Sequence, residues 1–201
     1  MEEPPDDEIV AHVRRGDEGA SRRLVELLYP TIASIVRKHL PRREEEEDLI
    51  QEVFMKLFAK MDSYAGKQPI AHWASRIAIN TCYDRLRRQK VRPVQNFAEL
   101  DLDEAEFLER ALHGQEETST SPEATETATE LLEKLLATLN PRERIVIRML
   151  DLEEKTIQET CNLTGWGASK VKVTAHRARR KLRATLARLE TNTKTTHKGN
   201  S

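Results

Sequence analysis

The chain has 201 residues and a formal net charge of only −1, and 33% of its residues are charged while 38% are hydrophobic. This length suits one domain or two small ones, and seven glycines with 4% aromatic residues favour packed helices over a sandwich or barrel. No apolar run approaches the roughly 18 residues of a membrane span, and the acidic start MEEPPDDEIV is unlike a secretory signal. We therefore expect an all-α protein of the cytoplasm, without membrane insertion.

The groups that usually carry catalysis are scattered. Cys82 and Cys161 lie in helical patterns without a second thiol or a Cys/His cluster nearby, so we expect buried thiols and no disulfide or zinc site. The six histidines are dispersed, and the sequence contains no Gly-rich phosphate loop or nucleophile beside a base. We predict no cofactor, no metal and no enzymatic activity.

Residues 1–93 are predicted to form the first helical domain. Apolar residues recur at helical spacing up to Leu40, with breaks at Gly16 and Pro30, which indicates two or three amphipathic helices. The segment EEDLIQEVFMKLFAKM follows and has apolar pairs four residues apart. This spacing predicts a helix from Asp48 to Met61 with a broad apolar stripe, most of which we expect to pack into the core.

The next helix, IAHWASRIAINTCYDRLRRQKV, ends in a cluster of cations. Arg85, Arg87, Arg88, Lys90 and Arg92 fall within eight residues. The helix macrodipole favours cations at this end, but the cluster exceeds what capping requires. We expect a contact with nucleic acid here.

An acidic segment divides two net-basic regions. Residues 95–130 hold eleven Asp or Glu against the single Arg110. The later part, GQEETSTSPEATETATE, has almost no large apolar residue to offset the entropy of ordering. We predict a flexible acidic linker over residues 94–127, and a disordered polar tail over residues 191–201.

Residues 128–190 are predicted to form a second helical domain containing a helix-turn-helix. One helix ends near Leu139, and Asn140 and Pro141 have the residue types of an N-cap and a first helical position. A short helix, TIQETCNL, then the turn TGWG, lead into a basic helix. Two helices joined by a Gly-containing turn are typical of DNA-binding proteins.

The basic helix has one apolar side and one positive side. Residues 168–189 hold eight Lys or Arg and no acid. At 100° per residue, the apolar side forms a narrow stripe that we expect to be buried. It consists of Val171, Ala175, Ala178, Leu182, Leu186 and Leu189. The opposite side carries Ser169, Lys172, Val173, His176, Arg177 and Arg180, with Lys170 and Arg179 at its flanks. A basic helix lying on an anionic membrane is the alternative, but the narrow stripe and preceding turn favour a DNA groove.

In their order and spacing, these segments resemble the extracytoplasmic-function (ECF) group of bacterial sigma factors. The stretch from EIVAHVRRGDEG to HWASRIAINTCYDRLRRQKV resembles sigma domain two, and LATLNPRERIVIRML with GASKVKVTAHRARRKLRATL resembles the helix-turn-helix of sigma domain four. The resemblance covers nearly the whole chain. It implies two small helical domains that bind core RNA polymerase and promoter DNA, usually under the control of an anti-sigma factor.

The resemblance also implies roles for individual residues. Contacts with core polymerase would come from Asp48, Gln51, Glu52, Phe54 and Lys56. Recognition and melting of the minus-ten element would involve Tyr64, Trp73, Arg76, Asn80, Arg85, Arg88 and Arg92. Recognition of the minus-thirty-five element would involve Ser169, Lys170, Lys172, Val173, His176, Arg177 and Arg180. For Trp73, which shares its helical phase with Ile70 and Ile77, core packing is an equal alternative.

Some features depart from the family or leave alternatives open. The loop DLEEKTIQE lacks the glycine that relatives often have, and Val173 and Thr174 replace residues that are usually polar or basic. Glu44 to Glu46 are either part of the polymerase contact or a solvated run. The acidic linker either shields the basic faces or follows the RNA exit path. A repressor or activator that uses the helix-turn-helix alone is the competing function.

Overall fold

The computed structural model describes residues 6–40, 45–89 and 131–197, and every regular element in these ranges is a helix. This confirms the predicted all-α class. The chain divides into two compact units, of which the first comprises Met1–Gln89 with Arg148–Val171 and the second Lys90–Ile147 with Lys172–Ser201. In this division, residues 148–171 group with the N-terminal helices. The predicted linker and Arg92 lie outside the described residues.

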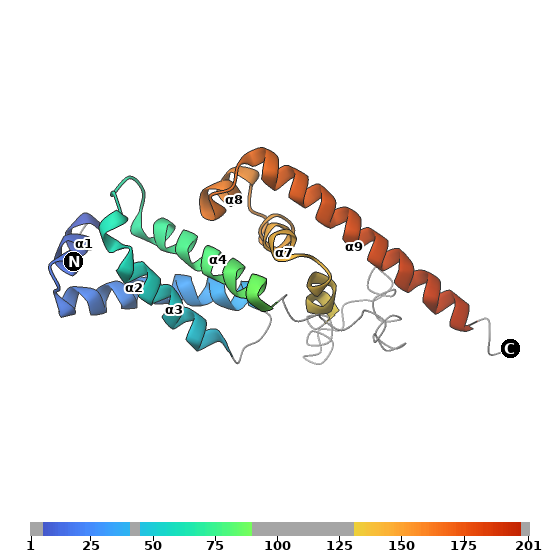
Figure 1. Ribbon diagram of the computed structural model, residues 1–201, viewed down its shortest axis with the longest axis horizontal. Coiled ribbons are helices and arrows are strands. Elements are labelled where there is room, and N and C mark those ends of the chain that lie inside the picture. The colour runs from blue at the N-terminus through green and yellow to red at the C-terminus, as the bar shows by residue number, and fades with distance from the viewer. Residues whose placement is uncertain (1–5, 41–44, 90–130, 198–201) are drawn as a thin grey trace, which may run out of the picture. The chain divides into compact units, whose positions relative to one another are not determined.

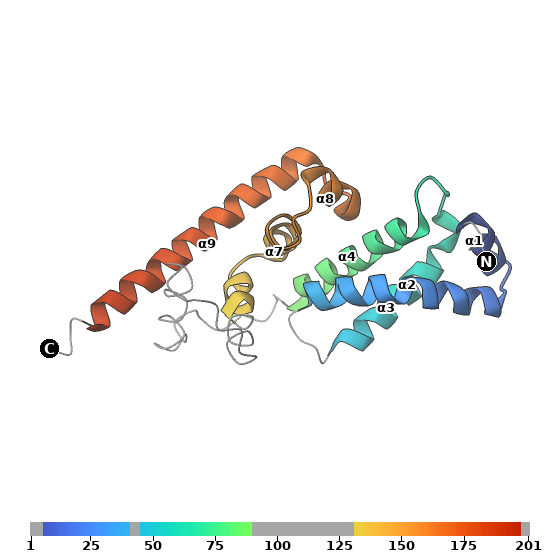
Figure 2. The ribbon, with the colours of Figure 1, turned by 180° about the vertical axis from the view of Figure 1, so that it is seen from behind.

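The N-terminal part of the first unit contains four helices and a short 3-10 turn, η2. Figures 1 and 2 show α2, α3 and α4 lying side by side, with α1 against α2. Their bounds are α1 Asp6–Arg14, α2 Glu18–His39, α3 Glu46–Ala59, η2 Met61–Ser63 and α4 Ile70–Gln89.

Helix α2 is longer than the sequence suggested. The break at Gly16 is confirmed: its φ is +81°, and the following Asp17 caps α2 by accepting the Ala20 N–H at 2.9 Å. The break predicted at Pro30 is wrong, because α2 continues through it. A proline removes one backbone hydrogen bond, while Leu28 and Ile32 on either side are fully buried and hold the helix against its neighbours.

Apolar side chains of α2, α3 and α4 form the core of this unit. Of the apolar pairs spaced by four in α3, Leu49, Ile50, Val53, Phe54 and Leu57 are buried and Phe58 is half-buried, which confirms that this stripe is mostly core. Fully or nearly fully buried are Leu24, Leu28, Ile32 and Val36 of α2, Leu49, Val53 and Leu57 of α3, and Ile70, Ala74, Ala78 and Cys82 of α4. Each buried aliphatic side chain contributes about 1.5–3 kcal/mol, so this core fixes the direction of α3 and α4.

Residues 148–171 complete the first unit. A π-helical turn, η4 (Arg148–Leu152), leads through a loop to α8 (Ile157–Thr164). Thr156 and Glu159 form a reciprocal capping box at the start of α8, and Gly165 ends it with a φ of +75°. In the preceding loop, Glu154 takes a φ of +52°, which is the conformation that a glycine would adopt without strain.

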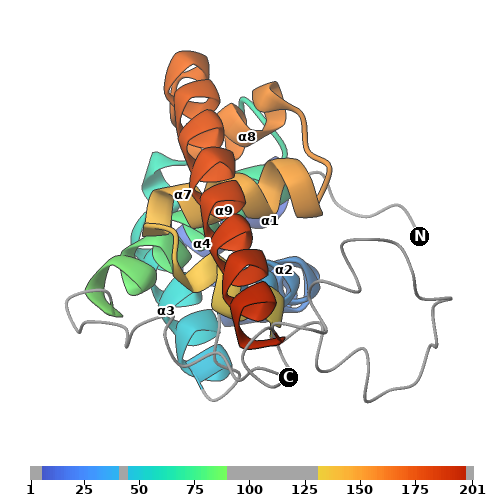
Figure 3. The same ribbon diagram turned by 90° about the vertical axis from the view of Figure 1, so that its right-hand side faces the viewer.

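The second unit packs a helical segment and α7 against α9. Residues 131–137 are helical, α7 spans Pro141–Ile147, and α9 spans Ala168–His197. Its core consists of Leu132, Leu136, Leu139, Ile147, Ala178 and Leu182. Figure 3 shows α7 crossing behind α9. Because α9 continues to His197, the disordered tail predicted from residue 191 is wrong for residues 191–197.

The predicted N-cap of α7 is confirmed. Asn140 Oδ1 accepts the Glu143 N–H at 2.9 Å, and Glu143 Oε2 accepts the Asn140 N–H at 3.0 Å. Both bonds satisfy backbone groups that the helix leaves unpaired at its start. This cap places the carboxylate of Glu143 beside α9, where it also accepts from Lys181 at 2.7 and 2.8 Å.

Candidate nucleic-acid interface

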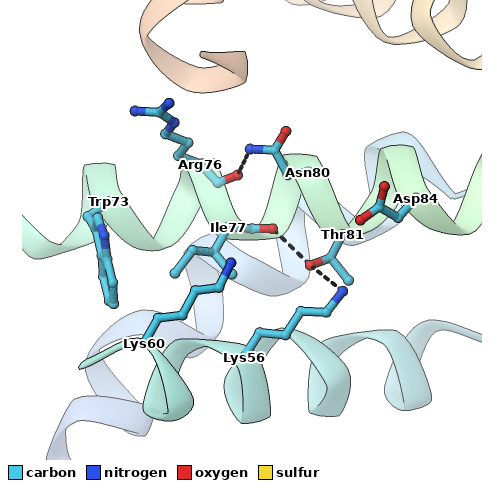
Figure 4. A pocket seen from close by; sticks show the side chains of 8 residues that line it. All are labelled: Lys56, Lys60, Trp73, Arg76, Ile77, Asn80, Thr81 and Asp84. Carbon is cyan, nitrogen blue, oxygen red and sulfur yellow. Dashed lines mark hydrogen bonds between the residues drawn. The ribbon is translucent and has the colours of Figure 1, made fainter. Parts of the chain in front are cut away.

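Helices α3 and α4 line a pocket of about 360 Å³ on the first unit (Figure 4). The lining residues are Lys56, Lys60, Trp73, Arg76, Ile77, Asn80, Thr81 and Asp84. The set combines three cations, an indole ring and a side-chain amide. Such a set can hold a phosphate, stack on a base and hydrogen-bond to a base edge.

Asn80 lies at the rim of this pocket, one helical turn after Arg76. Its Nδ2 donates to the Arg76 carbonyl at 2.8 Å, and Figure 4 shows its Oδ1 directed away from α4. The helix engages one of the two N–H donors of the amide, so the side chain still offers its carbonyl oxygen as an acceptor and one N–H as a donor. An exocyclic amino group of a base is the matching donor.

Lys56 is fixed inside the pocket instead of extending into solvent. Its Nζ lies 2.8 Å from Glu52 Oε1 and donates to Thr81 Oγ1 at 3.3 Å, and the Thr81 hydroxyl donates to the Ile77 carbonyl at 2.9 Å. The hydrogen bond from Lys56, with further contributions from Arg85, lowers the pKa of Glu52. Lys56 and Glu52, which are both predicted to contact polymerase, are therefore half-buried and bonded to side chains of α4.

Arg85 differs from the prediction that it holds DNA phosphates. Its guanidinium donates to Glu45 and to Glu52, both at 3.2 Å, and only 25% of its side chain is exposed. A guanidinium shared by two carboxylates joins α4 to α3 and offers little to a phosphate. Arg88 is largely exposed, with a loose 3.9 Å contact to Glu52, and Arg76 is exposed as well.

Tyr64, for which the resemblance implied a part in minus-ten recognition, does not present an open aromatic face. The side chain is buried, its hydroxyl donates to the Gln68 carbonyl at 2.6 Å, and its ring lies 5.4 Å from that of Trp73. The Arg14 guanidinium donates to the Tyr64 carbonyl, which connects α1 to the loop between η2 and α4. Tyr64 thus supports Trp73, and the half-buried Trp73 both packs on Tyr64 and lines the pocket.

The exposed surface of α3 carries some of the predicted polymerase-binding residues. Asp48 and Gln51 are exposed. Phe54, which the resemblance also assigned to the polymerase contact, is only 9% exposed and belongs to the core. Met55, which the sequence analysis missed, is 66% exposed. Met55 follows Gln51 by four residues and lies off the buried stripe, which is the signal that would have identified it.

The predicted DNA-facing surface of α9 is arranged as expected. Its seven side chains are all exposed: Ser169, Lys170, Lys172, Val173, His176, Arg177 and Arg180. On the opposite side Val171, Ala175 and Ala178 are buried. The Lys170 ammonium lies 5.9 Å from the ring of Trp166. We call this set of seven residues the α9 face.

The sequence analysis missed one further pocket residue, Lys60. It lies four residues after Lys56, just past the end of α3, and adds a third cation to the pocket. The spacing in KLFAKM was the available signal. Over residues 6–40, 45–89 and 131–197, no group of three His, Cys, Asp or Glu side chains is arranged to hold a metal ion. No helix in the same ranges is long and apolar enough to cross a membrane.

Comparison with known families matches both helical regions. Residues 24–92 match the family model for Sigma-70 region 2, and residues 129–182 match Sigma-70 region 4. The chain therefore belongs to the sigma-70 family. Members of this family are regulators of transcription rather than enzymes.

Individual relatives narrow the assignment. The ECF RNA polymerase sigma-E factor of Escherichia coli (strain K12) is 33% identical over 108 residues, which cover 54% of this chain and 55% of that protein. The ECF RNA polymerase sigma factor SigW of Bacillus subtilis (strain 168) is 30% identical over 81 residues, covering 40% and 43%. The matches span about half the length of these curated relatives. Within the sigma-70 family, the chain falls in the ECF group.

Solved structures share the fold. CnrH in complex with the cytosolic domain of CnrY superposes with a TM-score of 0.53 at 20% identity, covering 90% of this chain and 97% of that one. The sigma factor RpoE of Bartonella quintana, in complex with the anti-sigma factor NepR, gives 0.52 at 17% identity, covering 83% and 96%. At these identities the likeness concerns the fold alone.

Proposed function

We propose that this chain is a promoter-specificity subunit of bacterial RNA polymerase. It binds core polymerase, recognises the minus-thirty-five element with the α9 face, and melts the minus-ten element at the α3/α4 pocket. It acts in the cytoplasm without catalysis of its own. The observation that carries this proposal is the α9 face, seven exposed side chains opposite a buried stripe, within the segment matched by Sigma-70 region 4. The matched ranges also support domains that divide near Pro93 and Ala128.

On the α9 face, the division of labour follows from side-chain chemistry. The exposed cations, Arg177 and Arg180 among them, neutralise phosphates and supply a salt-sensitive affinity. Ser169, His176 and the exposed Val173 have groups that contact base edges, Val173 by apolar contact with a thymine methyl. Sequence preference therefore comes from the first turns of α9.

At the α3/α4 pocket, the proposed task is to hold DNA that has lost its pairing. Unstacking a base costs a few kcal/mol, and stacking on an aromatic ring returns about 1–3 kcal/mol. Trp73 supplies the ring, Asn80 an acceptor for a base edge, and Arg76 with Lys60 the charge for the flanking phosphates. These groups stabilise the open strand more than the duplex.

The proposed contact with core polymerase lies on α3. Asp48 and Gln51 provide a polar rim, and Met55 replaces Phe54 as the apolar anchor. We also propose an anti-sigma partner that covers these surfaces, since RpoE, which shares the fold, was solved with the anti-sigma factor NepR.

Run-off transcription with purified core polymerase on genomic fragments tests the proposal. We expect discrete start sites that require the chain. Arg177→Ala and Arg180→Ala should each lower the salt dependence of promoter binding by about 0.9 in slope, whereas Arg23→Ala, an exposed arginine of α2, should not. Failure to bind core polymerase would refute the proposal. Tight duplex binding without polymerase would favour the repressor or activator alternative.

Asn80→Ala tests the melting role separately. We expect this variant to form the closed promoter complex normally and to open it poorly. Permanganate footprinting of unpaired thymines measures opening directly. An unchanged footprint would remove Asn80 from the proposed role.

A further inference from the structure

Helix α1 lies beside the loop that joins α3 to α4, as Figures 1 and 2 show. We call residues 61–69, which comprise η2 and the segment up to α4, the pocket loop. Arg14, the last residue of α1, donates from Nη2 to the Met61 carbonyl at 2.9 Å and to the Tyr64 carbonyl, and from Nε to the Met61 carbonyl at 3.3 Å. The planar guanidinium thus holds two backbone carbonyls of the loop at a fixed separation.

The pocket loop has few other anchors in the core. Met61 and Tyr64 are buried, whereas every residue from 65 to 69 is exposed. Gly66 takes a φ of +67°, and the Tyr64 hydroxyl donates to the Gln68 carbonyl at 2.6 Å. A segment with few buried side chains opens locally at low cost. The hydrogen bonds from Arg14 therefore contribute a large share of what orders this loop.

The pocket loop in turn sets the position of the indole that lines the α3/α4 pocket. The Tyr64 ring lies 5.4 Å from the Trp73 ring, with the planes at 56°. The carbonyl of Pro69, the last residue of the loop, accepts the Trp73 backbone N–H at 3.2 Å. Arg14 holds the carbonyl of the same residue whose ring packs on Trp73, so a shift of that carbonyl displaces the ring. Arg14 therefore acts on the pocket through Tyr64, although it is not among the lining residues.

The packing of α1 does not depend on the Arg14 side chain. Ile9 and Val10 anchor this helix in the core, at 8% and 2% exposure. The side chain of Arg14 is 36% exposed, and its contact with the almost fully exposed Asp62 is loose, at 3.9 Å. Removing the guanidinium should therefore loosen the pocket loop and leave the helices packed.

We propose that Arg14 is a positioning residue for promoter opening, which orders the pocket loop so that Tyr64 holds the indole of Trp73 where an unpaired base can stack. The inference rests on the proposed function, since strand opening is the step that it affects. Stacking on a ring that is already in place costs less than stacking on one that must first be ordered. An ordered Trp73 thus favours the open strand, whereas the closed complex does not use it.

Trp73 fluorescence in the free, full-length chain tests the first link. The chain has two tryptophans, so Trp166→Phe leaves Trp73 as the single one. In this background Arg14→Met should raise acrylamide quenching of Trp73 roughly twofold, because a half-buried indole becomes accessible when the loop opens, with the helical circular dichroism unchanged. Arg15→Met is the matched control, since Arg15 is the adjacent exposed arginine, and it should behave like the parent. Unchanged quenching in Arg14→Met, or a loss of its helical signal, would overturn the inference.

Transcription from two templates tests the second link. On a duplex promoter with core polymerase, Arg14→Met should form the closed complex as the parent does and open it about tenfold less, as the loss of a charge-assisted hydrogen bond predicts. On a template whose minus-ten segment is already unpaired, the variant should transcribe like the parent. A chain that is merely destabilised is impaired on both templates, and that result would refute the positioning role.

Arg14→Lys separates geometry from charge. Its ammonium keeps the positive charge and lacks the planar pair of Nε and Nη2 that holds the two carbonyls. We expect Arg14→Lys to remain closer to Arg14→Met than to the parent in both quenching and opening. Opening like that of the parent would mean that the charge alone matters, through direct attraction of DNA, and would remove the positioning role.

The outcomes distinguish this inference from the proposed function. If the parent chain does not direct core polymerase to promoters, the proposed function is removed, and quenching in the free chain still decides whether Arg14 orders Trp73. If the parent transcribes and Arg14→Met opens promoters normally, the function stands and the positioning role is removed.

Discussion

Glu143 connects the start of α7 to the DNA-facing helix α9, so replacing it tests how the second unit is held together. Its carboxylate is only 4% exposed, yet it accepts the Asn140 N–H at 3.0 Å and the Lys181 ammonium at 2.7 and 2.8 Å. A capping residue is worth about 1 kcal/mol. A hydrogen bond to a charged group contributes about 1.5–3 kcal/mol, and we take the lower end because Lys181 is 51% exposed.

Together these terms predict that Glu143→Ala destabilises the second unit by about 2–3 kcal/mol. Glu143→Gln retains the hydrogen bond to Asn140 and loses the ion pair, so about 1.5 kcal/mol is expected. Hydrogen exchange of the α7 amides in the full chain measures both. Since 1.36 kcal/mol is a factor of ten, exchange should accelerate about 30- to 150-fold in Glu143→Ala and about 12-fold in Glu143→Gln.

The graded order of the two variants is the essential result. An acceleration below about threefold in Glu143→Ala would mean that neither the cap nor the ion pair stabilises the unit. Equal effects in both variants would mean that the charge alone matters and the cap does not.

Three further predictions concern residues whose placement is unusual. Glu154→Gly should stabilise the protein by about 0.5–1 kcal/mol, because a positive φ costs a non-glycine residue about 1–2 kcal/mol and glycine returns part of this as chain entropy; the urea midpoint measures it, and a lower midpoint would contradict it. Phe54→Ala should cost about 3–5 kcal/mol in thermal unfolding, whereas Met55→Ala should leave stability nearly unchanged and weaken binding to core polymerase; equal stability losses would refute this assignment. Burial raises the pKa of the Cys82 thiol to about 12, so at pH 8 a thiol reagent should modify Cys161 and reach Cys82 only after unfolding; equal native rates for the two would contradict this.

The sequence predicted best what depends on neighbours along the chain. The cap at Asn140 and the short helix ending at Gly165 are local, and the exposed side of α9 follows from its helical period. The break at Pro30 failed because tertiary packing of Leu28 and Ile32 outweighs one missing hydrogen bond.

Residues whose role depends on distant partners were beyond a reading of the sequence. Arg85 has a cationic neighbourhood in sequence, but Glu45, 40 positions away, and Glu52 take its guanidinium. For Tyr64 the resemblance implied a part in minus-ten recognition, and only the folded loop shows that its hydroxyl donates to the Gln68 carbonyl and its ring packs on Trp73. In both cases the contacts of the side chain depend on residues that the local sequence pattern does not reveal.

The carboxylate of Glu52 is a counterion common to two helices. It serves Lys56 on its own helix and Arg85 and Arg88 on α4. A molecule that docks on α3 and takes this carboxylate for its own hydrogen bonds leaves those cations with less negative charge beside them. The potential over α4 then becomes more positive where nucleic acid would approach, so occupancy of one helix changes the electrostatic attraction exerted by the other.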